Sequence, residues 1–402
     1  MPTALPDSDI LGSTESILRL LFRESSGFKF GKFNYSISPA SVYELLINSK
    51  YNKDYYRKRI VVLATSGIPF GMAFAQVYEC PVHFYLRKGW EITNNRLGPR
   101  PKILPILPTN SKLLLIDSHS FTQKTALGCQ ETIIKNRGNN HQVEELITLI
   151  GLDHFGTQPK DKIPETSFIS IMSNQDLLTR HFGSSLQTDL LDTLNKESEI
   201  WKSPEQSVDP GALNQPQFEL SRVSSLARDV FYKPSSEQLQ LTLINNNFQH
   251  KKARFEKYKS DDGVFDLFSN TTDMDMIRAA CNKSGVLNDY DMLVGVQAIG
   301  TSLAWALLYK SGLNTPIISS FCEAGIVPIP VTSLNNKKIL LIQGRMITGL
   351  DTATSISRIE QLGGSCNNVL TLWWKPELWN KIRCAPLFRL IDQRVKFTTF
   401  FC

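Results

Sequence analysis

Two stretches of the chain place polar and charged side chains directly after an apolar segment. In residues 113–125 the apolar segment ends at Asp117, and in residues 339–352 it ends at Gln343. Both stretches predict a buried strand, a short turn and the start of a helix. Such a unit can bind phosphate, because the first amides of the helix lack intrahelical partners and the helix dipole favours an anion. We therefore predict two phosphate-binding turns that have retained different residues.

The elements around these turns are predicted in the same order in both halves of the chain. Residues 60–75 and 292–308 each predict a strand, a short turn and a helix rich in small residues. A turn and a second strand follow each time, and the offset between the copies stays at roughly 220–235 residues. Strands that alternate with helices indicate a mostly parallel sheet, whose ligand turns lie together at the carboxyl ends of the strands.

The predicted fold class is therefore α/β, with two tandem domains that each contain a mostly parallel sheet flanked by helices. We place the first domain at residues 1–154 and the second at residues 226–402. Residues 155–225 contain five prolines and one or two amphipathic stretches, a pattern typical of a helical connector between the domains. The regular offset favours a tandem duplication.

Bulk composition bounds the class of protein. With 402 residues, the chain is long enough for two or three domains that each have a core. The net charge of +6 comes from 44 basic and 38 acidic residues, a balance that does not by itself indicate a nucleic-acid-binding protein. No apolar run reaches membrane-spanning length, and the first residues lack the layout of a signal peptide. The seven cysteines are scattered without a CxxC pair, as is typical of reduced thiols. We expect a cytoplasmic protein without a membrane segment.

The first half resembles orotate phosphoribosyltransferase, one of the type I phosphoribosyltransferases, in three segments. Residues 27–39 are similar to the N-terminal hood segment of that family, and residues 64–69, Ala-Thr-Ser-Gly-Ile-Pro, resemble its pyrophosphate-binding turn. Residues 84–88, Phe-Tyr-Leu-Arg-Lys, resemble the strand that carries basic residues toward the diphosphate. The second half resembles the family in the order of its elements and the positions of its turns. The two resemblances cover most of residues 15–150 and 245–375.

The resemblance implies that both turns derive from a loop that binds phosphoribosyl diphosphate (PRPP). In the family this loop has two adjacent acids, which hold the ribose hydroxyls and bias a magnesium site, followed by a Thr-rich turn for the 5′-phosphate. The first copy keeps one acid, Asp117, and has Ser118 in place of the second. In the second copy Gln343 and Gly344 replace both acids, and Asp351 puts a repulsive charge in the phosphate turn. We predict that the second copy is inactive in transfer.

The resemblance also assigns the candidate site residues. Asp117 and Lys88 are the candidate catalytic residues. Phosphate or PRPP binding is predicted for Thr65, Ser66, Gly67, Arg87, Lys88, Asp117, Ser118, Thr122, Lys124 and Thr125, and the second-copy loop contributes Thr348, Gly349 and Thr352. The structural alternatives are a tight turn at 65–67, a helix cap at 122–125 and an inherited scaffold at 348–352. Magnesium is expected only together with PRPP, and no metal site of the protein itself is predicted.

A catalytic loop follows the basic strand in the orotate enzymes and carries Lys, Asp, His and Gly. The corresponding residues 89–102 contain only Arg96, Arg100 and Lys102 as cations and no histidine. The segment 322–330 of the second half contains no cation at all. This second criterion also indicates that the second half has lost the transfer chemistry.

Two further sequence patterns have alternative interpretations. The run 50–59 mixes cations with aromatic residues, which predicts a solvated helix face, with contact to a nucleic-acid backbone as the alternative. The run 251–259 occupies a comparable place in the second half and adds to that alternative. The segments 371–379 and 397–402 are rich in aromatic residues, which is typical either of a core strand or of a protein interface.

The leading hypothesis is a divergent tandem phosphoribosyltransferase-like protein that binds a nucleotide or PRPP in its first domain, with weak or lost transfer activity. It would act as a regulatory, scaffold or effector subunit, for example in a bacterial defence system, and the resemblance implies a homodimer or another protein partner. The alternative is an active, orotate-like transferase of pyrimidine nucleotide synthesis in which only the first domain is catalytic. A PRPP synthase is disfavoured, because neither half has that family's acidic ribose-phosphate loop or ATP-site motifs.

Overall fold

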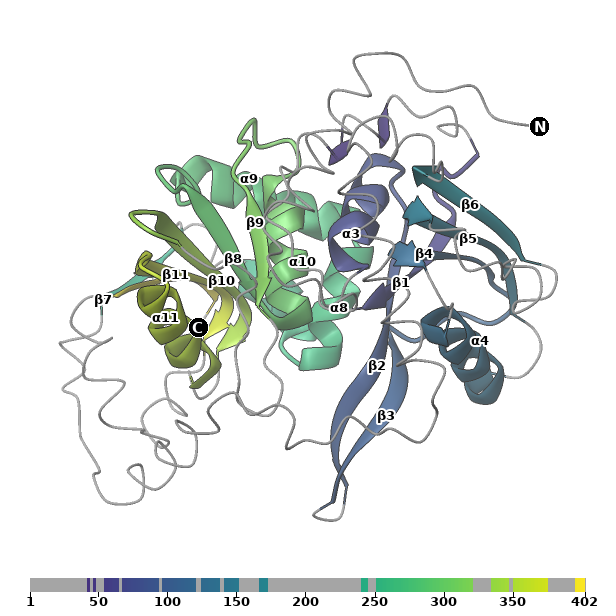
Figure 1. Ribbon diagram of the computed structural model, residues 1–402. Helices are drawn as coiled ribbons and strands as arrows, with labels where there is room; N and C mark the ends of the chain where they lie inside the picture. Colours follow the sequence, from purple (N-terminus) through teal and green to yellow (C-terminus); the bar gives the residue numbers. More distant parts are fainter. Residues whose placement is uncertain are drawn as a thin grey trace.

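The computed structural model describes residues 42–43, 46–47, 54–64, 67–93, 96–120, 124–137, 141–151, 166–172, 240–244, 251–320, 334–346, 350–374 and 395–401. These residues form two sheets with helices between and outside them (Figure 1). The α/β class and the mostly parallel sheets agree with the prediction. Among the described helices, none combines the length and the apolar content that crossing a membrane requires.

The first sheet has six strands in the order β3-β2-β1-β4-β5-β6. Only the β2–β3 pair is antiparallel. The strands β1 and β4 are apolar runs buried on both faces, as central parallel strands require. The elements are β1 (Arg59–Ala64), α3 (Ile68–Val77), β2 (Val82–Thr93), β3 (Arg96–Leu104), β4 (Lys112–Ser120), α4 (Lys124–Arg137), β5 (Gln142–Gly151) and β6 (Ser167–Met172).

The second sheet has six parallel strands in the order β7-β12-β11-β10-β8-β9. The helix α9 begins at a side-chain cap from Asn270 and ends at Gly285, whose φ of 65° suits glycine. The elements are β7 (Gln240–Leu243), α7 (Lys252–Phe255), the 3-10 helix η6 (Glu256–Tyr258), α8 (Asp261–Ser269), α9 (Thr271–Ser284), β8 (Met292–Val296), α10 (Gln297–Leu308), β9 (Ile317–Ser320), β10 (Lys338–Met346), α11 (Leu350–Gln361), β11 (Ser365–Trp374) and β12 (Lys396–Phe401).

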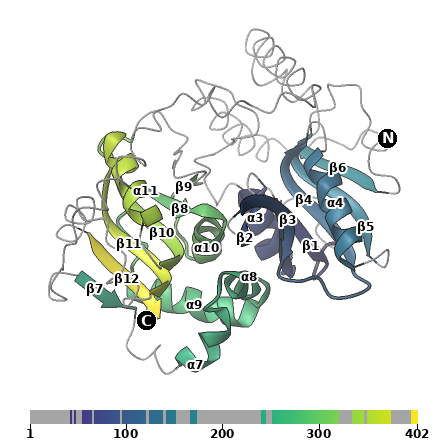
Figure 2. The same cartoon turned by 90° about the horizontal axis from the view of Figure 1, so that it is seen from below.

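Five strands follow the same order in both sheets. The series β2-β1-β4-β5-β6 of the first sheet corresponds to β9-β8-β10-β11-β12 of the second. The helix α3 follows β1 as α10 follows β8, and α4 follows β4 as α11 follows β10. The helices α3 and α10 share one buried cluster, whereas α4 and α11 contribute to separate clusters on the opposite faces of their sheets. The two sheets therefore face each other across α3 and α10 (Figures 1 and 2).

The described residues of 89–102, the segment for which the resemblance predicted a catalytic loop, belong to an antiparallel hairpin in this chain. β2 runs to Thr93 and pairs with β3, with Glu91 opposite Gly98. The pairing of β1 with β2 ends at Ala64 and Leu86, so the hairpin continues past the carboxyl edge of the sheet (Figure 1). Aromatic and β-branched residues at positions 90, 92 and 93 favour a strand here.

The segment predicted as a helical connector, residues 155–225, is described only at residues 166–172. These residues form β6, which pairs with β5 in parallel. The first sheet therefore continues beyond residue 154. The amphipathic stretches predicted for the connector lie outside the described residues.

Candidate functional site

The first candidate site lies where β1 and β4 reach the carboxyl edge of the first sheet. The amide of Gly67 donates a hydrogen bond to the carbonyl oxygen of Leu63 at 3.0 Å, which folds the turn tightly back on β1. A Cβ at Gly67 would lie 2.4 Å from the Leu63 oxygen and 3.2 Å from the Cα of Asp117. Only glycine fits such a close approach of two backbones. The fold therefore brings the β1–α3 turn against the acid that ends the apolar part of β4.

The other predicted residues of the first site lie around this contact. Asp117 is buried, with 8% of its surface exposed, and Thr125 in the first turn of α4 is half-buried. Arg87 and Lys88 follow Leu86 in β2, the strand next to β1, so their backbone lies at the same edge of the sheet. For Ser118 in β4 and Lys124 at the start of α4 the backbone is likewise placed. Thr65, Ser66 and Thr122 lie outside the described residues.

The second half repeats this backbone contact. A Cβ at Gly300 would lie 2.3 Å from the carbonyl oxygen of Ile342 and 3.3 Å from the Cα of Gln343. Gly300 and Gln343 thus correspond in space to Gly67 and Asp117. The turn after β4 and the turn after β10 also have the same length, since α4 begins at Lys124 and α11 at Leu350.

Side chains at the carboxyl edge of the second sheet contact one another. The hydroxyl of Thr352 donates to Oε1 of Gln343 and also lies 3.4 Å from Sδ of Met346. Thr352 is 1% exposed. In the first half Ala126 stands at the position of Thr352. Gln343 is therefore held by its own half of the molecule. Thr348 and Gly349, the other residues predicted for this loop, lie outside the described residues.

Ile299 also lies at the carboxyl edge of the second sheet, and the sequence patterns did not indicate it as a site residue. A Cβ at Gly344 would lie only 1.9 Å from Cγ2 of Ile299, and the next nearest side chain is Val264. An aliphatic side chain thus fills the space beside the backbone of Gly344. The first half has serines, Ser66 and Ser118, at the two corresponding positions. The signal that could have revealed this difference is the exchange of Thr-Ser for Ala-Ile directly before the glycine.

The described cations of the run 50–59 are engaged within the first half. Arg57 lies 3.8 Å from Glu79, and Lys58 lies 3.9 Å from Glu144. The guanidinium of Arg59 lies 3.2 Å from Nε2 of His83. These contacts favour the structural interpretation of this run over a nucleic-acid surface.

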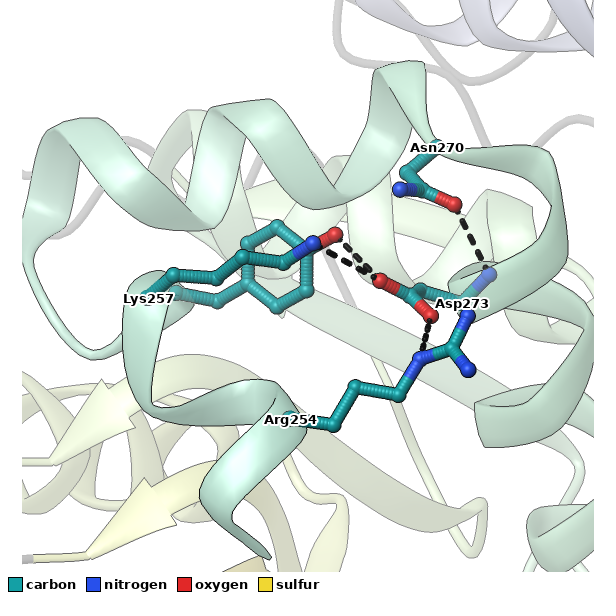
Figure 3. A network of polar contacts seen from close by, with 5 residues as sticks. Arg254, Lys257, Asn270 and Asp273 are labelled. Carbon is teal, nitrogen blue, oxygen red and sulfur yellow. Dashed lines mark hydrogen bonds and ion pairs between the residues drawn. The ribbon is translucent and has the colours of Figure 1, made fainter. Parts of the chain in front are cut away.

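The second basic run is tied to one buried acid (Figure 3). Asp273 in α9 accepts hydrogen bonds from Nε of Arg254 and from the hydroxyl of Tyr258, both at 2.5 Å, and its carboxylate lies 3.2 Å from Nζ of Lys257. Its amide donates to the side chain of Asn270 at 3.0 Å. Burial by itself raises the pKa of Asp273, but hydrogen bonds from Tyr258, Arg254 and Lys257 outweigh it and hold that pKa below its usual value. The network fastens α7 and η6 to the start of α9.

The described aromatic residues near the C-terminus belong to the core. Trp373 stacks on Phe401 with ring centroids 4.7 Å apart, and Phe401 stacks on Phe255 at 5.0 Å. Trp374 packs on Phe397. All five side chains are at most 1% exposed. Core packing is therefore the correct alternative for these residues.

Histidines and cysteines show no arrangement suited to catalysis in the described part of the chain. His83 is buried, which lowers its pKa to about 4, and its ring contacts the carbonyl oxygen of Pro105 and Arg59. Burial raises the pKa of Cys80, Cys281 and Cys366 to about 12, so these thiols stay protonated. The described residues contain no group of three or more His, Cys, Asp or Glu that could hold a metal ion.

Comparisons with known proteins find similarity only among solved structures. No family model and no curated protein sequence match the chain. Orotate phosphoribosyltransferase from Mycobacterium tuberculosis, solved with PRPP, is 13% identical, with 40% of this chain and 94% of that chain covered and a TM-score of 0.29. Adenine phosphoribosyltransferase from Thermoanaerobacter pseudethanolicus is 12% identical, with 34% and 84% covered and a TM-score of 0.28. Purine phosphoribosyltransferase from Pyrococcus horikoshii is 18% identical, with 32% and 81% covered and a TM-score of 0.24. Because these scores are low, we base the proposed function on the residues of the two sheet edges.

Proposed function

We propose that this chain is a tandem, divergent phosphoribosyltransferase-like protein that binds a nucleotide or PRPP at the first sheet edge. The observation that carries the proposal is the difference between two equivalent backbone contacts. At Gly67 the contact presents an acid, Asp117, whereas at Gly300 it presents Gln343, which Thr352 already engages. An acid next to a helix N-terminus suits a ligand that carries both ribose hydroxyls and a phosphate.

Each part of the first edge has a proposed role. Asp117 would accept hydrogen bonds from the ribose hydroxyls, and Thr122, Lys124 and Thr125 would bind the 5′-phosphate at the start of α4. The turn Thr65, Ser66 and Gly67, with Arg87 and Lys88 of β2, would bind the diphosphate of PRPP or the further phosphates of a nucleotide. Magnesium usually binds through one or two carboxylates together with substrate phosphates. A single carboxylate such as Asp117 fits that mode, so magnesium would arrive with PRPP.

We further propose that transfer activity is weak or lost and that the protein serves as a regulatory or scaffold subunit. The support is the sequence of the two loops. The first loop has only one of the family's two acids, and Gln123 and Lys124 stand where the family has glycines. The second edge is filled by Ile299 and closed by the contact between Thr352 and Gln343. Duplication followed by loss at one site explains the shared strand order of the two sheets.

An active, orotate-like transferase with a single catalytic half is the second candidate. The observation that favours it is the placement of Asp117, Arg87 and Lys88 at one edge of the same sheet. In this case Asp117 and Lys88 would support departure of the diphosphate, the first by orienting the ribose and the second by its positive charge.

Binding and turnover, measured on the same samples, separate the two candidates. The full chain is mixed with magnesium, PRPP and a panel of nucleobases, and diphosphate release is followed beside calorimetric binding. We expect PRPP to bind without turnover, and we expect binding to weaken about tenfold or more in Asp117→Ala and in Lys124→Ala, since each loses a charge-assisted contact. Turnover that disappears in Asp117→Ala would establish the transferase instead.

The second half supplies the matched control. Gln343→Ala changes the position equivalent to Asp117, and Leu350→Ala changes the position equivalent to Lys124. Both variants should bind PRPP as the wild type does. Absence of binding in the wild type, under conditions where unfolding experiments show it to be folded, would refute the ligand proposed for the first edge.

A further inference from the structure

The contact between the two halves is made by equivalent elements. α3 of the first half packs against α10 of the second (Figures 1 and 2), and both helices follow the central strand of their sheet. A contact between the same element of two similar units is the arrangement found in two-fold symmetric dimers. In this chain the two units are parts of one polypeptide.

Helices from each half also cross over onto the other half. Tyr43 of the first half packs on Trp305 of α10 and on Tyr309, the residue after α10, with ring centroids 6.0 and 5.1 Å apart. Its hydroxyl donates to the carbonyl oxygen of Trp305 at 3.0 Å. In return, Phe265 and Phe268 of α8 pack on Phe84 of β2, at 4.9 and 5.9 Å. Residues 42–43 and α8 occupy similar places before the central strand of each half, but they meet different elements of the opposite half, α10 and β2.

Polar groups close the rim of this interface. Arg278 of α9 donates through Nε to the carbonyl oxygen of Ala306 in α10 and through a second nitrogen to Oε1 of Gln76 in α3, both at 2.8 Å. It is only 6% exposed, and its third partner is Asp275. The hydroxyl of Ser269 in α8 donates to the carbonyl oxygen of Val82 at the start of β2. The bond from Arg278 to Gln76 and the bond from Ser269 to Val82 join the two halves. Separation of the halves would break both, and Arg278 would lose a partner of its buried guanidinium.

The second half packs on two elements of the first half, α3 and β2, and both lead to the proposed ligand site. α3 begins at the Gly67 turn, and its residues 68–75 are all buried. β2 leads to Arg87 and Lys88 at the carboxyl edge. α3 therefore lies between the first sheet and the second half, and β2 is the strand of that sheet on which α8 packs. Residues of both elements belong to one buried cluster.

We propose that the second half acts as a built-in partner subunit, whose α8, α9 and α10 position the ligand edge of the first half through β2 and α3. The second half thus contributes to the first site although its own edge is closed. The ligand part of this inference rests on the proposed function, whereas the positioning part does not.

A matched pair of variants in the full chain tests the inference. Phe265→Leu alters the contact with Phe84, and Phe397→Leu alters a contact with Trp374 in a cluster without first-half members. Hydrogen exchange followed by mass spectrometry reports on β1, β2 and α3. We expect faster exchange in these elements for Phe265→Leu and unchanged exchange for Phe397→Leu. Arg278→Lys, which keeps the charge and loses the two-pronged contact, should act on α3 in the same way.

Calorimetry measures the affinity of the same variants for PRPP. We expect Phe265→Leu and Arg278→Lys to weaken binding about threefold or more, and Phe397→Leu to leave it unchanged. Exchange that rises only within α8 and α9, or first-site binding that stays at the wild-type level in both interface variants, would overturn the inference. If the wild type itself does not bind PRPP, the proposed function fails, and the exchange comparison alone supports or overturns the role of the second half.

Discussion

At the scale of single residues, the two halves differ at a few positions that share one backbone framework. Gly67 and Gly300 both allow a turn to touch the neighbouring strand, and the strand residue they touch is Asp117 in one half and Gln343 in the other. The glycines therefore belong to the framework, and the residues facing them decide what the edge can bind. Ile299 adds bulk where the first half has a serine.

Substitution of the two glycines separates framework from ligand site. In Gly67→Ala and Gly300→Ala the new Cβ would lie within 2.4 Å of a main-chain oxygen. Because backbone cannot yield cheaply, we expect both variants to lose roughly 1–3 kcal/mol of the free energy of unfolding, measured by urea titration. Only Gly67→Ala should also weaken PRPP binding. Equal binding by both variants would show that the Gly67 turn is not part of the site.

At the scale of elements, a polar network around Asp273 holds α7 and η6 against α9. In the run 251–259 the aromatic residues are buried, and Arg254 and Lys257 are directed at Asp273. The two cations are half-exposed, whereas the Asp273 side chain has no exposed surface. The buried acid therefore gives this basic run a structural role.

The lowered pKa of Asp273 predicts how this network depends on pH. A carboxyl whose pKa is lower in the folded state stabilises the fold above its unfolded pKa, about 3.9, and loses that contribution as pH falls through the folded value. We expect Asp273→Asn to cost about 1.5–3 kcal/mol at pH 6 in urea unfolding. The difference from the wild type should shrink below pH 4.

Taking the difference in unfolding free energy between the wild type and Asp273→Asn also removes the contributions of other titrating groups to the pH dependence. His83, whose pKa is lowered to about 4, destabilises the folded wild type and the variant equally as pH falls from 6.5. It therefore cancels in the difference between the two proteins. A difference that stays constant from pH 6 to pH 3 would show that the charge of Asp273 contributes nothing to stability.

At the scale of the whole molecule, the two sheets are joined by one buried core. One buried cluster contains side chains from both sheets and from α3, α8, α9 and α10. Obligate interfaces resemble a domain core divided in two, and this contact has that character. The sequence predicted a homodimer or another protein partner, and the proposal above gives the second half the part of such a partner within the same chain.

A shared core predicts that both halves unfold together. Cys80 and Cys129 are buried in the first half, and Cys281 and Cys366 are buried in the second. Thiol labelling across a urea gradient, read by peptide mass spectrometry, should give one midpoint for all four cysteines, because loss of either half exposes the core of the other. Two separate midpoints, one for each pair, would show that the halves are independent domains.

The sequence by itself determined the α/β class, the two turns and the unequal residues they contain. These features are local, since apolar runs predict buried strands and the residue types after each run are read directly. The sequence did not predict that residues 42–43 and α8 each pack on the opposite half.

Only the tertiary structure decided which side chains meet. The contact of Ile299 with Gly344 and the hydrogen bond between Thr352 and Gln343 join separate elements, and so does the network at Asp273. The described residues of 89–102 form part of a hairpin, because pairing of β2 with β3 completes their backbone hydrogen bonds. The core shared by the two halves depends in the same way on contacts between residues more than two hundred positions apart, as between Tyr43 and Trp305.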